Sequence, residues 1–135
     1  MIHRSVVTEL VYAALYRPTT FQAGLLLGNR SDAGVSIHGY TGLQQTLGPF
    51  AHLLETLRDW GRMQARLSEG EDFVGWVCFD PTWSEALPVN IQVVHRTLFN
   101  LPHQVTALIN PTDGFWGLYG AASDGSLTPV PFHLV

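Results

Sequence analysis

Three side chains that could bind a metal or take part in catalysis lie close together in the second half of the chain: Cys78, Asp80 and His95. Cys78 and Asp80 stand two positions apart at the end of an apolar run, so on a strand their side chains would share one face. A catalytic zinc site uses about three protein ligands, and the third would have to be His95 or the more distant His52. The set therefore predicts, as one alternative, a metal-dependent hydrolase.

The other histidines give no recognisable metal motif, because the six, at positions 3, 38, 52, 95, 103 and 133, never show H-x-H or H-x-x-x-H spacing. Cys78 is the single cysteine, which excludes an intramolecular disulfide and a multi-cysteine zinc cage. Its neighbours Val77, Phe79 and Asp80 are apolar or anionic, and such surroundings raise the pKa of a thiol. We therefore expect Cys78 to be buried and unreactive, in a reducing compartment.

Composition narrows the classes of function. The chain has 135 residues, 46% of them hydrophobic and only 13% charged, which excludes intrinsic disorder and fits a single domain over residues 1–135. All seven basic residues are Arg, and with eleven acidic residues the net charge is −4. A surface of this charge is poorly suited to phosphate, so we expect no nucleic-acid binding. No apolar run approaches the length of a membrane span, and we expect a cytoplasmic protein.

Alternating helices and strands are predicted to position the candidate residues Cys78, Asp80 and His95. Apolar periodicity predicts helices over residues 6–15, 50–67 and 88–98. Strands are predicted over residues 22–28, 35–40, 73–79, 105–109, 115–119 and 130–135. Residues 42–48 fit either a loop or a short extension of the second strand. The order α-β-β-α-β-α-β-β-β predicts an α/β fold in which helices flank a mixed β-sheet.

Four segments in this order resemble the JAB/MPN (Mov34/PAD-1) domain family. Residues 22–28 resemble the strand in which that family carries a Glu followed by a glycine-bounded apolar run, and residues 74–81 resemble its Gly-Trp strand ending in H-x-H-P. Residues 104–111 resemble a later strand that ends before proline, and residues 131–135 resemble the closing strand. The resemblance spans nearly the whole chain and implies a JAB/MPN-like, cytidine-deaminase-like α/β domain.

The functional positions of that family are replaced in this sequence. Its metalloproteases hold zinc with two His and an Asp, use a Glu as base, and use a Ser to stabilise the oxyanion. Matched position by position, the Glu becomes Phe21, the two His become Cys78 and Asp80, the Ser becomes Pro88, and the Asp becomes Ile91. Neither Phe21 nor Ile91 can move a proton or bind a metal. The resemblance therefore implies a pseudoenzyme with neither metal nor other cofactor.

The main hypothesis is a non-catalytic domain that binds another protein, either itself as a homodimer or another MPN domain within a complex. We expect the contact surfaces on the first helix and on the helix predicted over residues 50–67. The candidate anchors are aromatic: Trp60, Trp83, Trp116 and Tyr119. Trp83 stands in a loop, so we expect it to be exposed. A further alternative keeps the vestigial cleft as a peptide or small-ligand pocket lined by Phe21, Phe79, Pro88 and Ile91.

Overall fold

A computed structural model describes residues 1–16, 21–31, 34–46, 71–84, 87–99 and 103–135. The first helix, α1 (Arg4–Tyr16), leads into the hairpin strands β1 (Phe21–Ser31) and β2 (Gly34–Thr46). Strand β3 (Asp72–Phe79) and helix α3 (Val89–Leu98) follow. The chain then forms β4 (Val105–Ile109), β5 (Trp116–Ala121) and β6 (Leu127–Pro129). The helix predicted over residues 50–67, with His52 and Trp60, lies outside the described residues.

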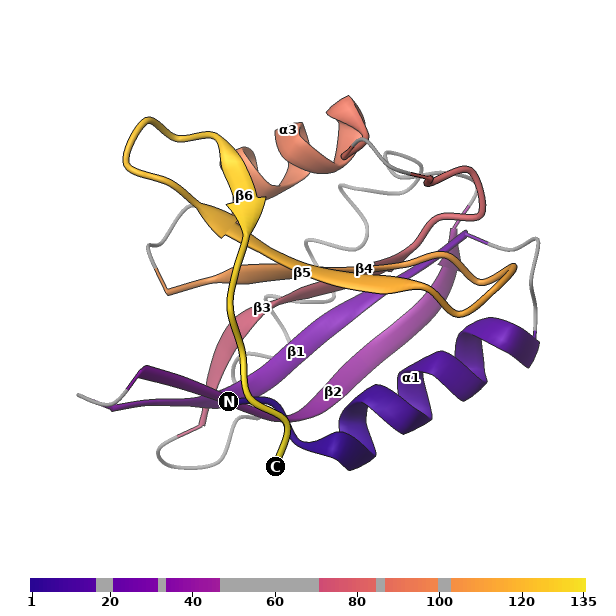
Figure 1. Cartoon of the computed structure of the whole chain (residues 1–135), viewed down its shortest axis with the longest axis horizontal. Helices are drawn as coiled ribbons and strands as arrows, with labels where there is room; N and C mark the ends of the chain where they lie inside the picture. The colour runs from indigo at the N-terminus through magenta and orange to yellow at the C-terminus, as the bar shows by residue number, and fades with distance from the viewer. Residues whose placement is uncertain (17–20, 32–33, 47–70, 85–86, 100–102) are drawn as a thin grey trace.

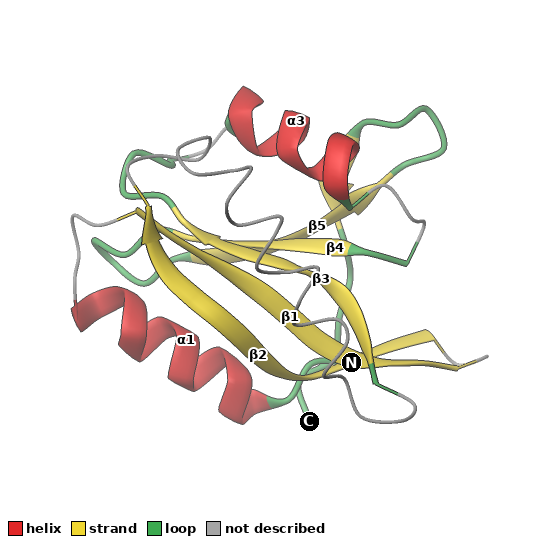
Figure 2. Cartoon of the chain, turned by 180° about the vertical axis from the view of Figure 1, so that it is seen from behind, coloured by secondary structure: helices red, strands yellow, loops and turns green. Residues whose placement is uncertain are grey.

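The strands form one mixed sheet in the order β2-β1-β3-β4-β5-β6. The pair β3–β4 is parallel, whereas the other neighbouring pairs are antiparallel. Helix α1 lies against one face of the sheet and α3 against the other, as the two opposite views show (Figures 1 and 2). The described residues thus confirm a mixed α/β fold in which helices flank the sheet.

Strand β3 is the centre of the packing because both of its faces are buried. Val74, Val77 and Phe79 join the apolar cluster that α1 covers, together with Val6 and Leu10 of that helix. Phe73, Trp76 and Cys78 join the cluster on the α3 face, which also contains Ile91. Burial on both sides explains why the sequence of β3 is aromatic and β-branched almost throughout.

Parallel pairing brings β4 very close to β3. Gly75 pairs with Val105, and a Cβ atom at position 75 would overlap the carbonyl oxygen of Val105. The glycine therefore permits the close backbone approach that sets the register, in which Trp76 lies beside Thr106 and Cys78 beside Leu108.

Several predicted bounds are confirmed and others need correction. The strands predicted over residues 73–79 and 105–109 are confirmed. Strand β2 continues to Thr46, so residues 42–46 of the segment left open extend the strand, while residues 47–48 lie outside the described part. The strand predicted over residues 130–135 is wrong, because β6 occupies Leu127–Pro129 instead. Pro129 and Pro131 have no N–H to continue a ladder. The C-terminal segment instead makes an isolated parallel bridge between Leu134 and Ile2.

None of the helices among the described residues is long and apolar enough to cross a membrane.

Candidate functional site

The backbone brings several of the candidate positions toward one end of the sheet. Cys78 is the penultimate residue of β3, and Asp80 follows directly after the strand. Pro88 precedes α3, and Ile91 lies in the first turn of that helix. Phe21 begins β1, whose next residues pair with the end of β3. Cys78 is thus close to both Asp80 and Ile91, while the side chain of Phe21 is outside the described part.

Cys78 is enclosed by apolar side chains and has no route to solvent. Its exposed fraction is 2%, and it packs in one cluster with Ile91, which is fully buried, and with Trp83. Burial raises the pKa of the Cys78 thiol far above its usual value, and the nearby charge of Asp80 raises it further. The side chain therefore stays a neutral thiol, which is neither a nucleophile nor a good metal ligand.

The Asp80 carboxylate holds the turn that follows β3. Its Oδ1 atom accepts hydrogen bonds from the backbone N–H of Thr82 at 2.8 Å and from the Thr82 hydroxyl at 2.6 Å. The backbone N–H of Asp80 donates to the carbonyl of Ile109 at 2.9 Å, which joins the turn to the end of β4. With an exposed fraction of 2%, Asp80 is a local structural acceptor.

His95 does not join Cys78 and Asp80. Its Nδ1 atom lies 2.6 Å from the hydroxyl oxygen of Thr106, a hydrogen bond that holds the ring over β4. Thr106 pairs with Trp76, which stands two residues before Cys78 on β3, a separation of about 7 Å along the strand. Burial lowers the pKa of His95 to about 4, so the ring is neutral near pH 7. Within the described ranges, no three His, Cys, Asp or Glu side chains gather closely enough to hold a metal.

The expectation that Trp83 is exposed is wrong. The side chain is 2% exposed, stacks on Phe115 at a centroid distance of 4.9 Å, and meets Tyr119 edge-on at 6.4 Å. The turn held by Asp80 folds the chain back onto the sheet, and Asn110 donates from Nδ2 to the carbonyl of Trp83 at 2.6 Å. Trp83 is therefore a core residue that closes this end of the α3 face.

The other candidate anchors are only partly accessible. Trp116 is half-buried and packs against Phe132, with ring centroids 4.8 Å apart. Tyr119 is half-buried beside Trp83, and burial raises the pKa of its hydroxyl. Neither ring has the exposure expected of a dominant contact residue in the free chain.

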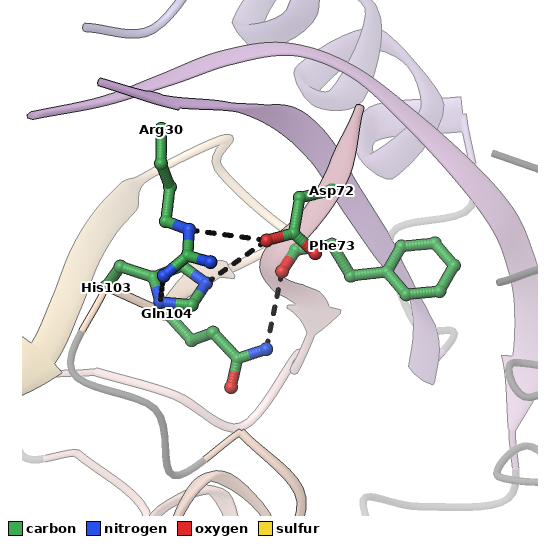
Figure 3. A network of polar contacts seen from close by, with 5 residues as sticks. All are labelled: Arg30, Asp72, Phe73, His103 and Gln104. Carbon is green, nitrogen blue, oxygen red and sulfur yellow. Dashed lines mark hydrogen bonds and ion pairs between the residues drawn. The ribbon is translucent and has the colours of Figure 1, made fainter. Parts of the chain in front are cut away.

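A polar network joins the β1–β2 hairpin to the start of β3 (Figure 3). Arg30 donates from Nη1 to Nδ1 of His103 at 3.1 Å, and its Nε lies 3.4 Å from the Asp72 carboxylate. The same carboxylate lies 3.6 Å from Nε2 of His103, while Gln104 donates to the carbonyl of Phe73 at 3.3 Å. Because both ring nitrogens face groups of the chain itself, His103 is a link between strands rather than a free base.

The chain matches no protein-family model, and no curated protein is significantly similar to it.

Sequence reasoning missed the aromatic side chains that are most exposed among the described residues, which lie on α1. Tyr12 and Tyr16 are 73% and 83% exposed, and Leu15 beside them is 44% exposed. The signal was present, because Thr8, Tyr12 and Tyr16 are spaced by four residues on the side of the helix opposite its buried stripe. Helix α1 itself remains a candidate contact surface.

Proposed function

We propose that the chain is a JAB/MPN-like domain without a catalytic metal, which works by binding another protein. Two features of the fold support the resemblance on which this rests. The described elements follow the expected order, with a helix and hairpin first and then strand, helix and three strands. Several of the residues matched to the family's functional positions also lie toward one end of the sheet.

The observation that carries the proposal is that this end of the sheet is filled by the chain's own side chains. Cys78 and Ile91 pack in a single apolar cluster, and the Asp80 carboxylate accepts the two hydrogen bonds from Thr82 that hold the turn. A hydrolytic metal needs several exposed ligands and an open coordination position, and these groups offer neither. The same packing argues against a peptide or small ligand at these positions, since an occupant would have to displace buried residues.

The exposed chemistry of the described part supports contact with protein. On α1, the apolar and aromatic side chains Val11, Tyr12, Leu15 and Tyr16 follow one another along the outer side. Exposed apolar patches of a few hundred Å² commonly mark interaction sites, and Tyr is one of the residues that contribute most to binding energy.

Metal loading tests the non-catalytic half of the proposal. The purified chain is incubated separately with Zn²⁺, Mn²⁺ and Fe²⁺ under reducing conditions, desalted, and analysed for metal content by mass spectrometry. We expect less than about a tenth of an equivalent of each metal, because the catalytic zinc sites of proteins need about three ligands. The Cys78→Ala variant, measured in parallel, should retain the same low content.

Stoichiometric metal in the wild-type chain that Cys78→Ala or Asp80→Ala loses would overturn the proposal and favour the hydrolase alternative. A peptidase assay with the loaded protein then distinguishes a structural metal from a catalytic one.

A further inference from the structure

Helix α1 is apolar on two sides, although the sheet covers only one. Val6, Leu10 and Ala14 are buried against the sheet. The other side of the helix carries two neighbouring rows of residues, each spaced by four positions: Val7, Val11 and Leu15 in one, and Arg4, Thr8, Tyr12 and Tyr16 in the other. Neither row contains an acidic residue. Exposed apolar side chains that gather on the outer side of a helix are typical of a contact surface.

A groove runs between the two rows. It has a volume of about 370 Å³ and is lined by Val7, Thr8, Val11, Tyr12 and Leu15. Packed helices place a row of side chains from one helix into such a groove on the other. Because α1 presents a row and a groove on the same side, one copy of this surface fits a second copy.

We propose that the partner of α1 is α1 of a second copy of the chain, an inference that rests on the proposed function. The two helices would be antiparallel and related by a two-fold axis that passes at the level of Leu10. In this register Arg4 lies opposite Tyr16 of the other copy, which suits a cation–π contact. Thr8 lies opposite Tyr12, so a small side chain faces a large one twice. This self-complementarity is what an isologous interface requires.

The charges of the two rows are compatible with a second copy. The chain carries a net charge of −4, so two copies repel each other unless the contact excludes acidic groups. The two rows do so, and their one charged member, Arg4, is basic. The acidic side chain of α1, Glu9, lies outside both rows.

The exposed area is enough for a weak dimer. At about 200 Å² for a tyrosine, Tyr12 and Tyr16 together expose about 300 Å² per protomer. The turn before β5 adjoins the rows, because a Cβ atom at Gly114 would lie 3.2 Å from Val11, and it carries Phe115, which is 57% exposed. Covering all of these groups would bury about 1,000 Å² over both copies, the lower end for a specific interface. An interface of this size is typical of weak association.

Light scattering after size-exclusion chromatography, over protein concentrations from a few to several hundred micromolar, tests the pairing. The wild-type chain should move from monomer to dimer across this range. Tyr12→Glu should weaken the dimer at least tenfold, because each pair would then bury two carboxylates. The control, Val89→Glu, places the same charge on an equally exposed apolar residue of α3, 72% exposed, and should leave the dimer unchanged. Circular dichroism confirms that both variants fold.

Disulfide trapping tests the register. A tagged Thr8→Cys chain is mixed with an untagged Tyr12→Cys chain and mildly oxidised; Cys78 stays out of the reaction because it is buried. The mixed pair should cross-link several times faster than either variant with itself, and Val89→Cys should not cross-link. Equal rates for the mixed and unmixed pairs would overturn the antiparallel arrangement.

A chain that remains monomeric at every concentration, or a dimer that Tyr12→Glu leaves intact, would overturn the pairing through α1. Neither result would alter the metal content, so failure of this inference is distinguishable from failure of the proposed function.

Discussion

The buried histidine of α3 gives the fold a predictable dependence on pH. His95 is 1% exposed, and burial lowers its pKa from 6.5 to about 4. Between these two values the unfolded chain binds a proton that the folded chain does not. The free energy of unfolding must therefore decrease as the pH falls through this window, and the contribution of the neutral ring is fully present only above about pH 6.5.

The size of the effect follows from the two pKa values. At full burial, lowering the pH from 7 to 4.5 would remove about 2.5 kcal/mol of stability. Water that reaches the ring through local opening of α3 reduces this penalty, so we expect a loss of about 1–2.5 kcal/mol.

Urea denaturation at pH 7.0, 6.0, 5.0 and 4.5 measures this loss as a change in midpoint at constant m-value. His95→Gln keeps a polar group near Thr106 but cannot titrate, so its stability should vary less with pH by about the stated amount. His103 contributes in the same direction, because burial and Arg30 lower its pKa, and His103→Gln measures that share separately. The hydrogen bonds of Asp124 with Ser126 lower the pKa of that carboxyl, so its contribution is lost only below about pH 3.8.

The reasoning would be refuted if His95→Gln kept the full pH dependence of the wild-type chain. It would equally be refuted if an NMR titration of the folded protein gave His95 a pKa near 6.5, since no linkage to folding would then remain.

Three further substitutions test the packing around the candidate site, each read from urea denaturation with folding checked by circular dichroism. Gly75→Ala should cost several kcal/mol of stability or prevent folding, because its Cβ atom would overlap the Val105 carbonyl. The control, Gly39→Ala, should cost less than about 1 kcal/mol, because the nearest atom to its Cβ would be 3.9 Å away. Equal costs would contradict the close approach of β3 and β4. Ile91→Ala should destabilise by about 2–5 kcal/mol, and a loss below about 1 kcal/mol would mean that an open cleft exists there. Asp80→Ala should cost about 1–3 kcal/mol through loss of the turn, and a gain in stability would indicate a strained functional carboxylate instead.

The central strands were predictable because local chemistry determines them. The segments that became β3 and β4 are dense in β-branched and aromatic residues and end at Asp80-Pro81 and Asn110-Pro111, which stop a strand. The full length of β2 was not predictable, because its last residues pair with the beginning of β1 in a register with two irregularities. That pairing depends on residues more than twenty positions apart.

The burial of Trp83 shows the same limit at the candidate site. Its loop position suggested exposure, and nothing within ten residues indicates otherwise. Its ring is covered by Phe115 and Tyr119, more than thirty residues later in the chain, after the Asp80 turn has directed it inward. Local sequence could therefore identify Cys78 and Asp80 as candidate site residues, but not that Phe115 and Tyr119 cover the neighbouring Trp83.

Two of the three side chains that first suggested chemistry support a non-catalytic function for one physical reason. Cys78 lies in an apolar cluster and the Asp80 carboxylate is bonded within a turn, whereas His95 bonds Thr106 through Nδ1 and keeps a buried Nε2 atom without a partner. A catalytic group must keep part of its bonding capacity for a substrate or metal, and that unmet capacity costs stability when it is buried. On the described surface, exposed apolar and aromatic side chains instead gather on the outer rows of α1. Such a surface gains free energy by being covered, which is a property of an interface rather than of an active site.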